Sequence, residues 1–377
     1  MTIGVAVLGS TGSIGCSTLQ VLARQRERFR VVALTAHSNA GLLAQQVSEW
    51  NPAYVGLVNG GSGETGEGRG AGIGCLVEAA THADVRIVVN GIVGAAGLEA
   101  TLAALRAGKR VALANKETLV MAGELVTRAA REGGGEIVPV DSEHSAVLQC
   151  VTGRRPTELA RLILTASGGP FRTWDPARAA RATVAEALRH PTWKMGKKIT
   201  VDSATLVNKA LEVIEAHFLF GIGYDQVEVV VHPQSVIHAF AEFVDGSVLA
   251  QVGFPTMELP ILYALTHPER VADSGVRRFD PVAAGDLTFE AVRSDLFPAY
   301  GLGREAARAG GTAPAAFNAA NEVAVELFLD ERIACGRIAE IIACVLERHR
   351  TGDAGSLEAV LAADADARRL AREAACS

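Results

Sequence analysis

Short apolar runs alternate with helical stretches through the first 140 residues of the chain. Each run has the length of a buried strand, and apolar positions at helical spacing follow several of them. Strands that alternate with helices predict a sheet covered by helices, which is an α/β fold. The strands are expected at residues 3–8, 31–34, 85–89, 110–114 and 137–140, with helices over 16–28 and up to residue 107.

The second half of the chain has a different order of elements. Strands are expected at 161–164 and 227–231, followed by a hairpin over 236–251 that turns at Asp245-Gly246. A helix over 201–216 places Leu206, Ala210 and Val213 on one buried stripe. From about residue 301 the chain is rich in Ala, Glu and Arg at helical spacing and predicts a helical terminal domain. Residues 59–74 are so rich in glycine that we expect a surface loop without a packed element.

The first strand runs directly into the segment GSTGSIG at residues 9–15, and a helix follows. Glycines let a backbone approach a pyrophosphate, and a helix N-terminus supplies free N–H groups and a positive dipole. Ser10, Thr11 and Ser13 add hydroxyl groups for a phosphate. The segment therefore predicts a dinucleotide site, with a tight turn that binds nothing as the alternative.

The end of the second strand distinguishes the two nicotinamide cofactors. An NAD site usually has an acidic residue there for the ribose 2′-hydroxyl, and this chain has none before Glu49. A carboxylate would repel a 2′-phosphate, so its absence favours NADP(H). His37, Ser38 and Asn39 offer hydrogen bonds at this position but no permanent positive charge.

Two carboxylates follow the strand at 137–140. Asp141 and Glu143 are two residues apart, and on an extended chain such side chains point the same way. Two carboxylates in one crevice repel each other unless a cation or a proton joins them. Oxygen ligands without Cys or His favour Mg²⁺ or Mn²⁺ over zinc. The alternative is that both residues cap the next helix and face water.

Other polar stretches lie where strands are predicted to end. Lys116 either contacts the substrate or is a solvated lysine at the start of a helix. The small residues of Gly94–Gly97 either let the backbone approach a cofactor or allow close packing of a helix on the sheet. Ser167-Gly168-Gly169 is an anion-binding nest or a plain turn. Residues 189–198 suit a lid with hinges near Pro191 and Gly196, or a loop whose Trp193 fills the core.

One helical turn of the later helix carries three polar groups. Asn208, Lys209 and Glu212 share a face because they are three or four residues apart. They could present an amide, an ammonium and a carboxylate to a ligand, or Lys209 and Glu212 could form a surface pair. His232 could be catalytic or a packed core imidazole.

Composition restricts the class of protein. The 377 residues are 49% apolar and 21% charged, with a net charge of −6, which makes nucleic acid an improbable partner. The six cysteines form no C-x-x-C pair, which indicates reduced thiols in a cytoplasmic protein. We expect neither a signal peptide nor a membrane span.

The chain resembles the 1-deoxy-D-xylulose 5-phosphate reductoisomerases of non-mevalonate isoprenoid biosynthesis. The resemblance rests on segments that run in order along nearly the whole chain: GSTGSIG (9–15), GAAGL (94–98), ANKE (114–117), PVDSEH (139–144), SGGPF (167–171), HPTW (190–193), MGKKITVDSAT (195–205), NKALEVIEA (208–216), HPQSVIH (232–238), DGSVLAQ (245–251) and NAANE (318–322). Two positions depart from the family pattern. His37-Ser38 replaces a Gly-Lys or Gly-Arg pair, which puts the 2′-phosphate contact in doubt, and Thr256 replaces a common Asp.

The resemblance implies a role for individual residues. It makes Asp141, Glu143 and Glu212 the ligands of a divalent cation (Mg²⁺, Mn²⁺ or Co²⁺). The substrate would contact Lys116, Ser142, Glu143, Ser167, His190, Ser203, Asn208, Lys209 and Glu212. NADPH would contact Thr11, Gly12, Ser13, Ile14, Asn39, Asn115, Glu117 and Gly196. The expected catalytic residues are Lys116, Asp141, Glu143, His190, Glu212 and His232.

The resemblance also implies the architecture and the reaction. It implies an N-terminal Rossmann-like NADPH-binding domain (1–143), a central α/β catalytic domain (144–265) with a lid (187–198), a linker (266–300) and a C-terminal helical domain (301–377), in a homodimer. The reaction would isomerise and reduce 1-deoxy-D-xylulose 5-phosphate to 2-C-methyl-D-erythritol 4-phosphate. The rival hypotheses are a plain NADP-dependent sugar-phosphate dehydrogenase and a nucleotide-sensing module without turnover.

Overall fold

The computed structural model describes residues 2–60 and 68–376, and the chain folds into two compact units. The first unit comprises Met1–Thr118, Val126–Ser145 and Thr256–Arg277, and the second comprises Leu119–Leu125, Ala146–Pro255 and Arg278–Ser377. Among the described residues, no helix is long and apolar enough to cross a bilayer.

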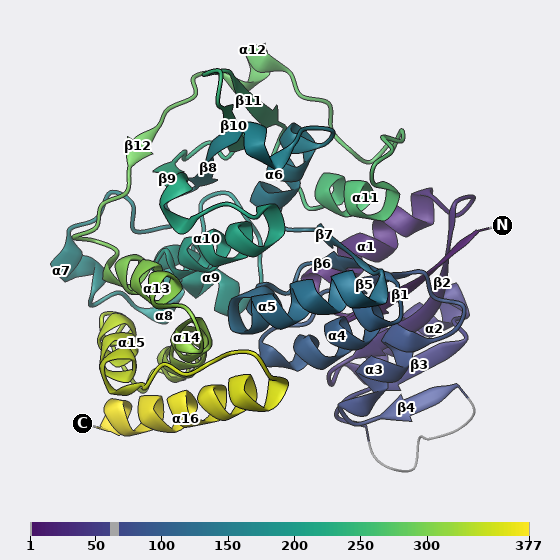
Figure 1. The fold of residues 1–377 in the computed structure, drawn as a ribbon, viewed down its shortest axis with the longest axis horizontal. Coiled ribbons are helices and arrows are strands. Elements are labelled where there is room, and N and C mark those ends of the chain that lie inside the picture. The colour runs from purple at the N-terminus through teal and green to yellow at the C-terminus, as the bar shows by residue number, and fades with distance from the viewer. Residues whose placement is uncertain (1, 61–67, 377) are drawn as a thin grey trace. The chain divides into compact units, whose positions relative to one another are not determined.

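A seven-stranded parallel sheet forms the centre of the first unit (Figure 1). Its strands are β1 (Ile3–Leu8), β2 (Phe29–Ala36), β3 (Tyr54–Leu57), β4 (Arg69–Ala71), β5 (Ile87–Asn90), β6 (Arg110–Leu113) and β7 (Glu136–Pro139). Their order in the sheet is β4-β3-β2-β1-β5-β6-β7. This arrangement confirms the predicted Rossmann-like α/β fold.

The strand order reverses at β1, which pairs with β2 on one side and with β5 on the other. In open parallel sheets, ligands bind beyond the carboxyl ends of the strands at such a switch point. Val5, Ala6, Val7 and Leu8 of β1 are fully buried. A continuous apolar run is needed here because helices cover both faces of a parallel sheet.

The helices of the first unit and of its junctions with the second follow the strands in chain order. They are α1 (Ser13–Arg24), α2 (Ala40–Trp50), α3 (Gly74–Thr81), η1 (Ala95–Gly97), α4 (Leu98–Arg106), α5 (Lys116–Gly133), α6 (Ser142–Val151) and α11 (Glu258–Thr266). The expectation that residues 59–74 hold no packed element is wrong for β4, which pairs in parallel with β3. Residues 61–67 of that segment lie outside the described residues.

A five-stranded mixed sheet forms one layer of the second unit. Its strands are β8 (Leu159–Ala166), β9 (Val227–Val231), β10 (Ile237–Phe243), β11 (Val248–Val252) and β12 (Glu290–Ala291), in the order β11-β10-β8-β9-β12. Strands β10 and β11 form the predicted hairpin. Val213 and Ala216 of the helix α10 pack against Leu162 and Leu164 of β8.

Helices make up the rest of the second unit. They are η2 (Pro156–Glu158), α7 (Pro176–Ala179), α8 (Val184–Ala187), α9 (Lys197–Ala204), α10 (Val207–Phe220), η3 (Tyr224–Gln226), α12 (Pro281–Ala284), α13 (Pro298–Ala309), α14 (Ala313–Leu329), α15 (Arg337–Arg348) and α16 (Leu357–Cys376). The last four confirm the predicted helical C-terminal region, whose core includes the fully buried Phe317.

Two differences from the expected organisation have local causes. The helix predicted over 201–216 is broken, because Leu206 has φ +59° and separates α9 from α10. The segment 256–265, expected in the catalytic domain, belongs to the first unit, where α11 contacts α1, β6 and β7. Arg24 of α1 pairs with Glu258 of α11 at 2.5 Å and with Asp273 at 2.6 Å.

Candidate active site

The glycine turn after β1 has the geometry of an anion-binding loop. Gly9 has φ +78°, and a Cβ built on Gly15 would lie 2.3 Å from the carbonyl oxygen of Gly9. The first glycine therefore makes the turn, and the last one lets α1 begin close to the strand. Gly12 occupies the N-cap of α1 and makes no side-chain cap. The N–H groups at the start of α1 are therefore not capped by that residue and suit an anion.

One of the three hydroxyls expected at this turn is structural. Ser10 is fully buried, and its Oγ donates to Gln46 Oε1 at 2.7 Å, while Gln46 Nε2 donates back to the Ser10 carbonyl at 2.9 Å. Its proposed phosphate contact is therefore wrong. Thr11 is half-buried and Ser13 is exposed, so both remain candidates.

The end of β2 is open and carries no carboxylate. His37, Ser38 and Asn39 are exposed. Asn39 Oδ1 accepts the N–H of Leu42 at 3.1 Å and so caps α2. The Asn39 side chain thus fixes the loop and has only its amide nitrogen to offer a cofactor.

Asn115 joins two loops of the first unit. Its Oδ1 accepts the N–H of Thr118 at 3.1 Å and caps α5, while its Nδ2 donates to the carbonyls of Ile92 at 2.8 Å and Gly94 at 2.9 Å. The residue is 1% exposed. A Cβ on Gly97 would lie 2.8 Å from Asn90 Nδ2, so at this position the small residue serves close packing.

Asp141 and Glu143 follow β7 in a tight turn. Helix α6 begins at Ser142, and Asp141 Oδ1 accepts the N–H of Glu143 at 3.2 Å, as in an N-cap. The assumption of an extended chain was therefore wrong, and capping is correct in part. The alternative that both residues face water is wrong for Asp141, whose side chain is 14% exposed and pairs with the buried Lys116, and Glu143 is half-buried. Ser142 Oγ donates to Glu143 Oε2 at 2.6 Å.

Glu212 lies on a helix whose side chains are buried on nearly every face. It is 1% exposed, it pairs with Lys209, and its Oε1 accepts from Asn208 Nδ2 at 2.5 Å. The three residues thus share one turn of α10, as their spacing predicted. The pair of Lys209 and Glu212 is buried, so the alternative of a surface pair is wrong.

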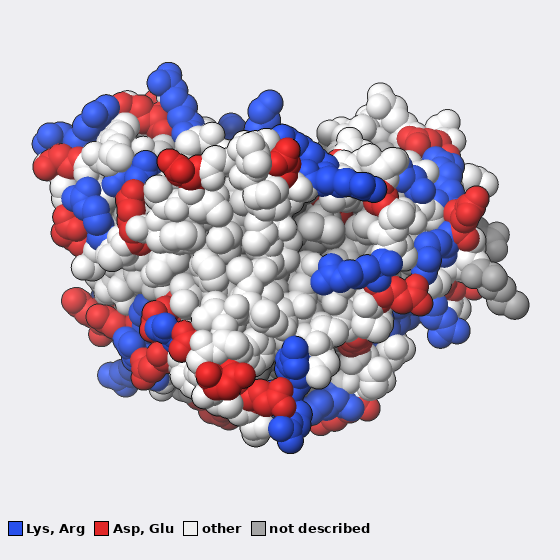
Figure 2. All heavy atoms as spheres, turned by 90° about the horizontal axis from the view of Figure 1, so that it is seen from above, with Lys and Arg blue, Asp and Glu red and all other residues white. Residues whose placement is uncertain are grey.

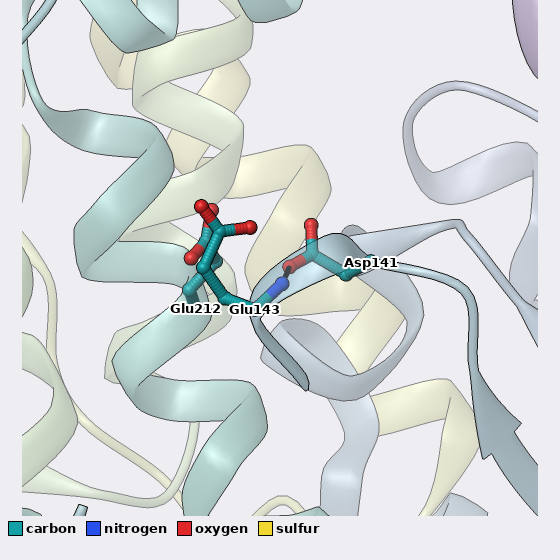
Figure 3. A group of neighbouring side chains, drawn as sticks. All are labelled: Asp141, Glu143 and Glu212. Carbon is teal, nitrogen blue, oxygen red and sulfur yellow. Dashed lines mark hydrogen bonds between the residues drawn. The ribbon is translucent and has the colours of Figure 1, made fainter. Parts of the chain in front are cut away.

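Figure 3 shows Asp141, Glu143 and Glu212 as a group of neighbouring carboxylates. Each offers one oxygen, and these oxygens lie within 4.8 Å of one another. Carboxylate oxygens alone are the donor set that Mg²⁺ and Mn²⁺ prefer. Clustered negative charges repel one another without a cation or proton between them. The residues therefore fit a divalent cation.

The loop after β8 presents groups suited to a phosphate. Gly168 has φ +81° and Gly169 has φ +63°, conformations that favour glycine, and the Gly169 N–H donates to Ser167 Oγ at 3.2 Å. Ser167 Oγ also lies 2.9 Å from His190 Nε2. A Cβ on Gly169 would lie 2.7 Å from the carbonyl oxygen of Ser203, so this loop packs directly on the end of α9.

His190 connects that loop with the expected lid. Its Nδ1 accepts the N–H groups of Thr192 at 3.2 Å and Trp193 at 2.9 Å. Burial lowers the pKa of His190 from 6.5 to about 4. The neutral ring then carries its proton on Nε2 and donates it to Ser167 Oγ, which assigns the tautomer from the hydrogen bonds. Trp193 is half-buried, with its ring centroid 6.4 Å from that of His238.

The surroundings of His232 favour the alternative of a packed core imidazole over a catalytic role. It is fully buried, and its ring stacks on Phe289 at 4.7 Å. Nδ1 lies 2.9 Å from the carbonyl of Thr288, to which it donates, and Nε2 accepts the N–H of Val236 at 3.2 Å. Both ring nitrogens thus have backbone partners.

Sequence reasoning assigned no role to Lys198 and Asp202, although both lie in a segment that it quoted. Lys198 Nζ lies 2.8 Å from Asp202 Oδ2. The (i, i+4) spacing of opposite charges beside Ser203 was the available signal.

These observations define a class of protein. The site combines a glycine turn at the switch point of a parallel sheet, three carboxylates suited to a divalent cation and a loop suited to a phosphate. This combination is typical of a nicotinamide-dependent oxidoreductase with an anionic substrate.

Comparisons with known proteins identify the family. Family models for 1-deoxy-D-xylulose 5-phosphate reductoisomerase match residues 5–123, and those for its C-terminal domains match 137–220 and 252–370. The chain belongs to the 1-deoxy-D-xylulose 5-phosphate reductoisomerase family. The reductoisomerase of Synechococcus sp. (strain JA-2-3B'a(2-13)) is 50% identical over 380 residues, covering 97% of this chain and 95% of its own.

Solved structures of the same family have the same fold. A reductoisomerase in complex with NADPH, fosmidomycin and magnesium matches with a TM-score of 0.95 and 41% identity, over 99% of this chain and 98% of that one. The enzyme from Zymomonas mobilis in complex with NADPH matches with a TM-score of 0.92 and 43% identity, over the whole of both chains.

Proposed function

We propose that this chain converts 1-deoxy-D-xylulose 5-phosphate, NADPH and a proton into 2-C-methyl-D-erythritol 4-phosphate and NADP⁺, with a divalent cation. The proposal rests on the cluster of three carboxylates, those of Asp141, Glu143 and Glu212, in a chain of this family. A cation held there would stabilise negative charge on oxygen while the carbon skeleton rearranges, a step that a plain dehydrogenase does not catalyse.

The three carboxylates would hold Mg²⁺, Mn²⁺ or Co²⁺. When bound, such an ion polarises a carbonyl group and stabilises negative charge on oxygen. Lys116 and Lys209 each pair with one of the carboxylates, Asp141 and Glu212 respectively, and limit the charge repulsion within the group. Ser142 orients Glu143 through its hydroxyl.

The substrate phosphate would bind to Ser167, Ser203, Asn208 and Lys209. These groups come from the loop after β8, from the end of α9 and from the start of α10, all within the second unit. His190 donates to Ser167 Oγ, so the hydroxyl proton of Ser167 is free to point at a phosphate oxygen. Binding the phosphate supplies orientation for the reacting end of the sugar.

NADPH would bind at the glycine turn. The pyrophosphate would meet Thr11 and Gly12, which precede α1, and Ser13 and Ile14, which begin it. The exposed Asn39 would lie at the adenosine end of the cofactor. Asn115, Glu117 and Gly196 are the remaining proposed contacts. The nicotinamide supplies a hydride when bound, and relatives of solved structure contain NADPH.

The segment 187–198 would act as a lid over the substrate. It runs from Ala187, the last residue of α8, to Lys198, the second residue of α9, and the Trp193 N–H donates to His190 Nδ1. The ties to His190 suit a loop that closes as one piece and keeps water from a reactive aldehyde. His190 would act by orienting the Ser167 hydroxyl and by holding the lid through its bond to the Trp193 N–H.

We also propose a cytoplasmic homodimer. Strand β11 is an edge of the mixed sheet; its residues Val248 and Leu249 are 49% and 41% exposed, and Val244, which follows β10, is 69% exposed. Figure 2 shows a face of the molecule with few charged side chains across its centre. Exposed apolar side chains such as Val244, Val248 and Leu249 favour a partner. The six free cysteines fit a reducing compartment.

An assay of NADPH oxidation tests the proposal and separates it from its rivals. With 1-deoxy-D-xylulose 5-phosphate and Mg²⁺ or Mn²⁺, we expect consumption of NADPH and formation of 2-C-methyl-D-erythritol 4-phosphate, both abolished by EDTA. Turnover that survives the chelator would favour a plain dehydrogenase. Binding of NADPH without any turnover would favour a nucleotide-sensing module.

A further inference from the structure

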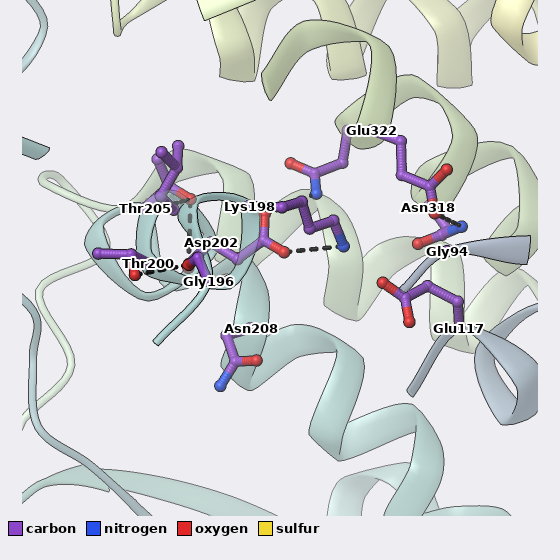
Figure 4. Close-up of polar contacts among 12 residues, drawn as sticks. Gly94, Glu117, Gly196, Lys198, Thr200, Asp202, Thr205, Asn208, Asn318 and Glu322 are labelled. Carbon is purple, nitrogen blue, oxygen red and sulfur yellow. Dashed lines mark hydrogen bonds and ion pairs between the residues drawn. The ribbon is translucent and has the colours of Figure 1, made fainter. Parts of the chain in front are cut away.

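A buried carboxylate in the second unit has a partner on a distant segment. Asp202 of α9 is 1% exposed, its Oδ2 lies 2.8 Å from Lys198 Nζ, and its Oδ1 accepts from Asn321 Nδ2 of α14 at 2.8 Å. Figure 4 shows Lys198 and Asp202 on one helix, with their contact drawn as a dashed line. The Asn321 amide has a defined orientation, because only its nitrogen can donate to a carboxylate.

Helix α9 depends on such outside contacts. It has eight residues, too few for a stable helix in isolation, and its N-cap is Gly196, which makes no side-chain cap. At its other end Leu206 has φ +59°, a strained conformation for a residue other than glycine. Lys198 is the charge partner of Asp202, and Asn321 supplies a hydrogen bond to its other oxygen. Leaving a buried carboxylate oxygen without its donor is unfavourable, so the contact of Asn321 with Asp202 helps to hold α9 against α14.

The helix that provides Asn321 is itself anchored. Asn318 Nδ2 donates to Glu322 Oε1 at 3.0 Å within α14, and Glu322 Oε2 accepts from Arg368 of α16 at 2.5 Å. Arg368 also donates to Asp364 at 2.7 Å. The segment NAANE therefore contains one residue that reaches α9, Asn321, and one that ties α14 to α16, Glu322, whereas the bond of Asn318 stays within α14.

The end of α9 supports the phosphate-binding groups. Ser203 follows Asp202, and its carbonyl oxygen lies 2.7 Å from where a Cβ on Gly169 would be. A displacement of α9 would therefore move Ser203 and the Ser167–Gly169 loop together. We propose that Asp202 and Asn321 are positioning residues for the substrate phosphate: their hydrogen bond fixes α9 and thereby the distance between these groups. This inference rests on the proposed function.

Exchanging the carboxylate and the amide between positions 202 and 321 tests the proposal. Asn321→Asp places two carboxylates face to face, and we expect KM for 1-deoxy-D-xylulose 5-phosphate and the inhibition constant of inorganic phosphate to rise about 10-fold or more. Adding Asp202→Asn restores an amide that donates to a carboxylate, and both constants should return to within about 3-fold of the wild type. The affinity for NADPH should not change. If Asn321→Asp does not fold, Asn321→Ala replaces it, with the same expected rise.

Asn318→Ala is the matched control, since Asn318 is equally buried in α14 but its amide nitrogen bonds within the helix. It should lower the melting temperature and leave both constants within about 2-fold of the wild type. Unchanged constants in Asn321→Asp, no recovery in the double variant, or an equal rise in the control would overturn the proposal. A wild-type chain without turnover of the phosphorylated sugar would instead contradict the proposed function.

Discussion

The Ser167 hydroxyl owes its proposed role to two neighbours that use its lone pairs. The Gly169 N–H and His190 Nε2 both donate to Ser167 Oγ. The hydroxyl must then donate outward, which suits a phosphate oxygen. This arrangement holds only while His190 is neutral with its proton on Nε2, because its Nδ1 accepts two backbone N–H groups.

Titration of His190 follows from its burial. Because burial lowers its pKa to about 4, the ring should stay neutral throughout the range from pH 5 to 8. The folded state then binds fewer protons than the unfolded state between pH 6.5 and 4, so the contribution of His190 to stability is complete above 6.5 and decreases as the pH falls toward 4. An NMR titration should show flat ring chemical shifts for His190 from pH 8 down to pH 5, and a midpoint near 6.5 would contradict the assignment.

His232 provides a second test at the scale of single residues. Both of its ring nitrogens bond to the backbone, so His232→Asn should lower the melting temperature by several degrees through loss of packing and of one of these bonds. The folded variant should keep kcat within about 5-fold of the wild type. A fall of about 100-fold with an unchanged melting temperature would restore a catalytic role.

Sequence patterns predicted individual side chains well where local spacing decides their neighbours. Asn208, Lys209 and Glu212 meet because residues three and four apart share a helix face. Their burial could not be predicted from one turn of helix, since it depends on what packs around α10. Ser10 was misassigned for the same reason: its partner Gln46 is 36 residues away.

At the scale of elements, the junction of β1 and α1 requires glycine at position 15 but not at position 12. Gly15 allows α1 to approach the strand, with backbone atoms of Gly9 and Ser10 only 2.3 and 2.4 Å from where a Cβ would be. At Gly12 the nearest such atom is 3.3 Å away, a tight but tolerable contact.

These two glycines give a matched pair of variants. Gly15→Ala should displace α1 and weaken NADPH binding by about 100-fold or more, with a clear loss of stability. Gly12→Ala should keep the melting temperature within a few degrees of the wild type. Fluorescence titration with NADPH and thermal unfolding measure these effects, and an equal loss of stability in the two variants would contradict the role assigned to close packing at Gly15.

Strongly patterned elements were predictable, and weakly patterned ones were not. The apolar runs of β1, β2, β5, β6 and β7 and the hairpin of β10 and β11 match their predictions because each is specified by its own residues. Strand β4 has only three residues, Arg69–Ala71, and exists because β3 offers a free edge. The break at Leu206 has no local signal, since leucine is a good helix former.

At the scale of the whole molecule, the chain divides differently from the prediction. Three domains in sequence order were expected, yet two compact units contain the described residues, and each is built from separate segments. The segment 256–277 returns to the first unit through contacts of Arg24 with Glu258 and Asp273. Such long-range pairings depend on the folded arrangement of distant segments, which a single sequence does not specify.

The same limit applies to the proposed cation site. Its three ligands come from a turn after β7 and from α10, about 70 residues later, and only two of them share a local motif. Their grouping was expected from the family resemblance, and the residue types alone left helix capping and a surface ion pair as alternatives.

Binding of Mn²⁺ is the measurement that tests the central claim most directly. Titration followed by electron paramagnetic resonance should show one Mn²⁺ per wild-type chain, and Glu212→Gln should weaken that binding by about 100-fold or more and abolish turnover. The Kd for NADPH should remain within about 2-fold of the wild type, since Glu212 is not among its proposed contacts. Unchanged Mn²⁺ binding in Glu212→Gln, or an equal loss of NADPH binding, would contradict a site shared by Asp141, Glu143 and Glu212.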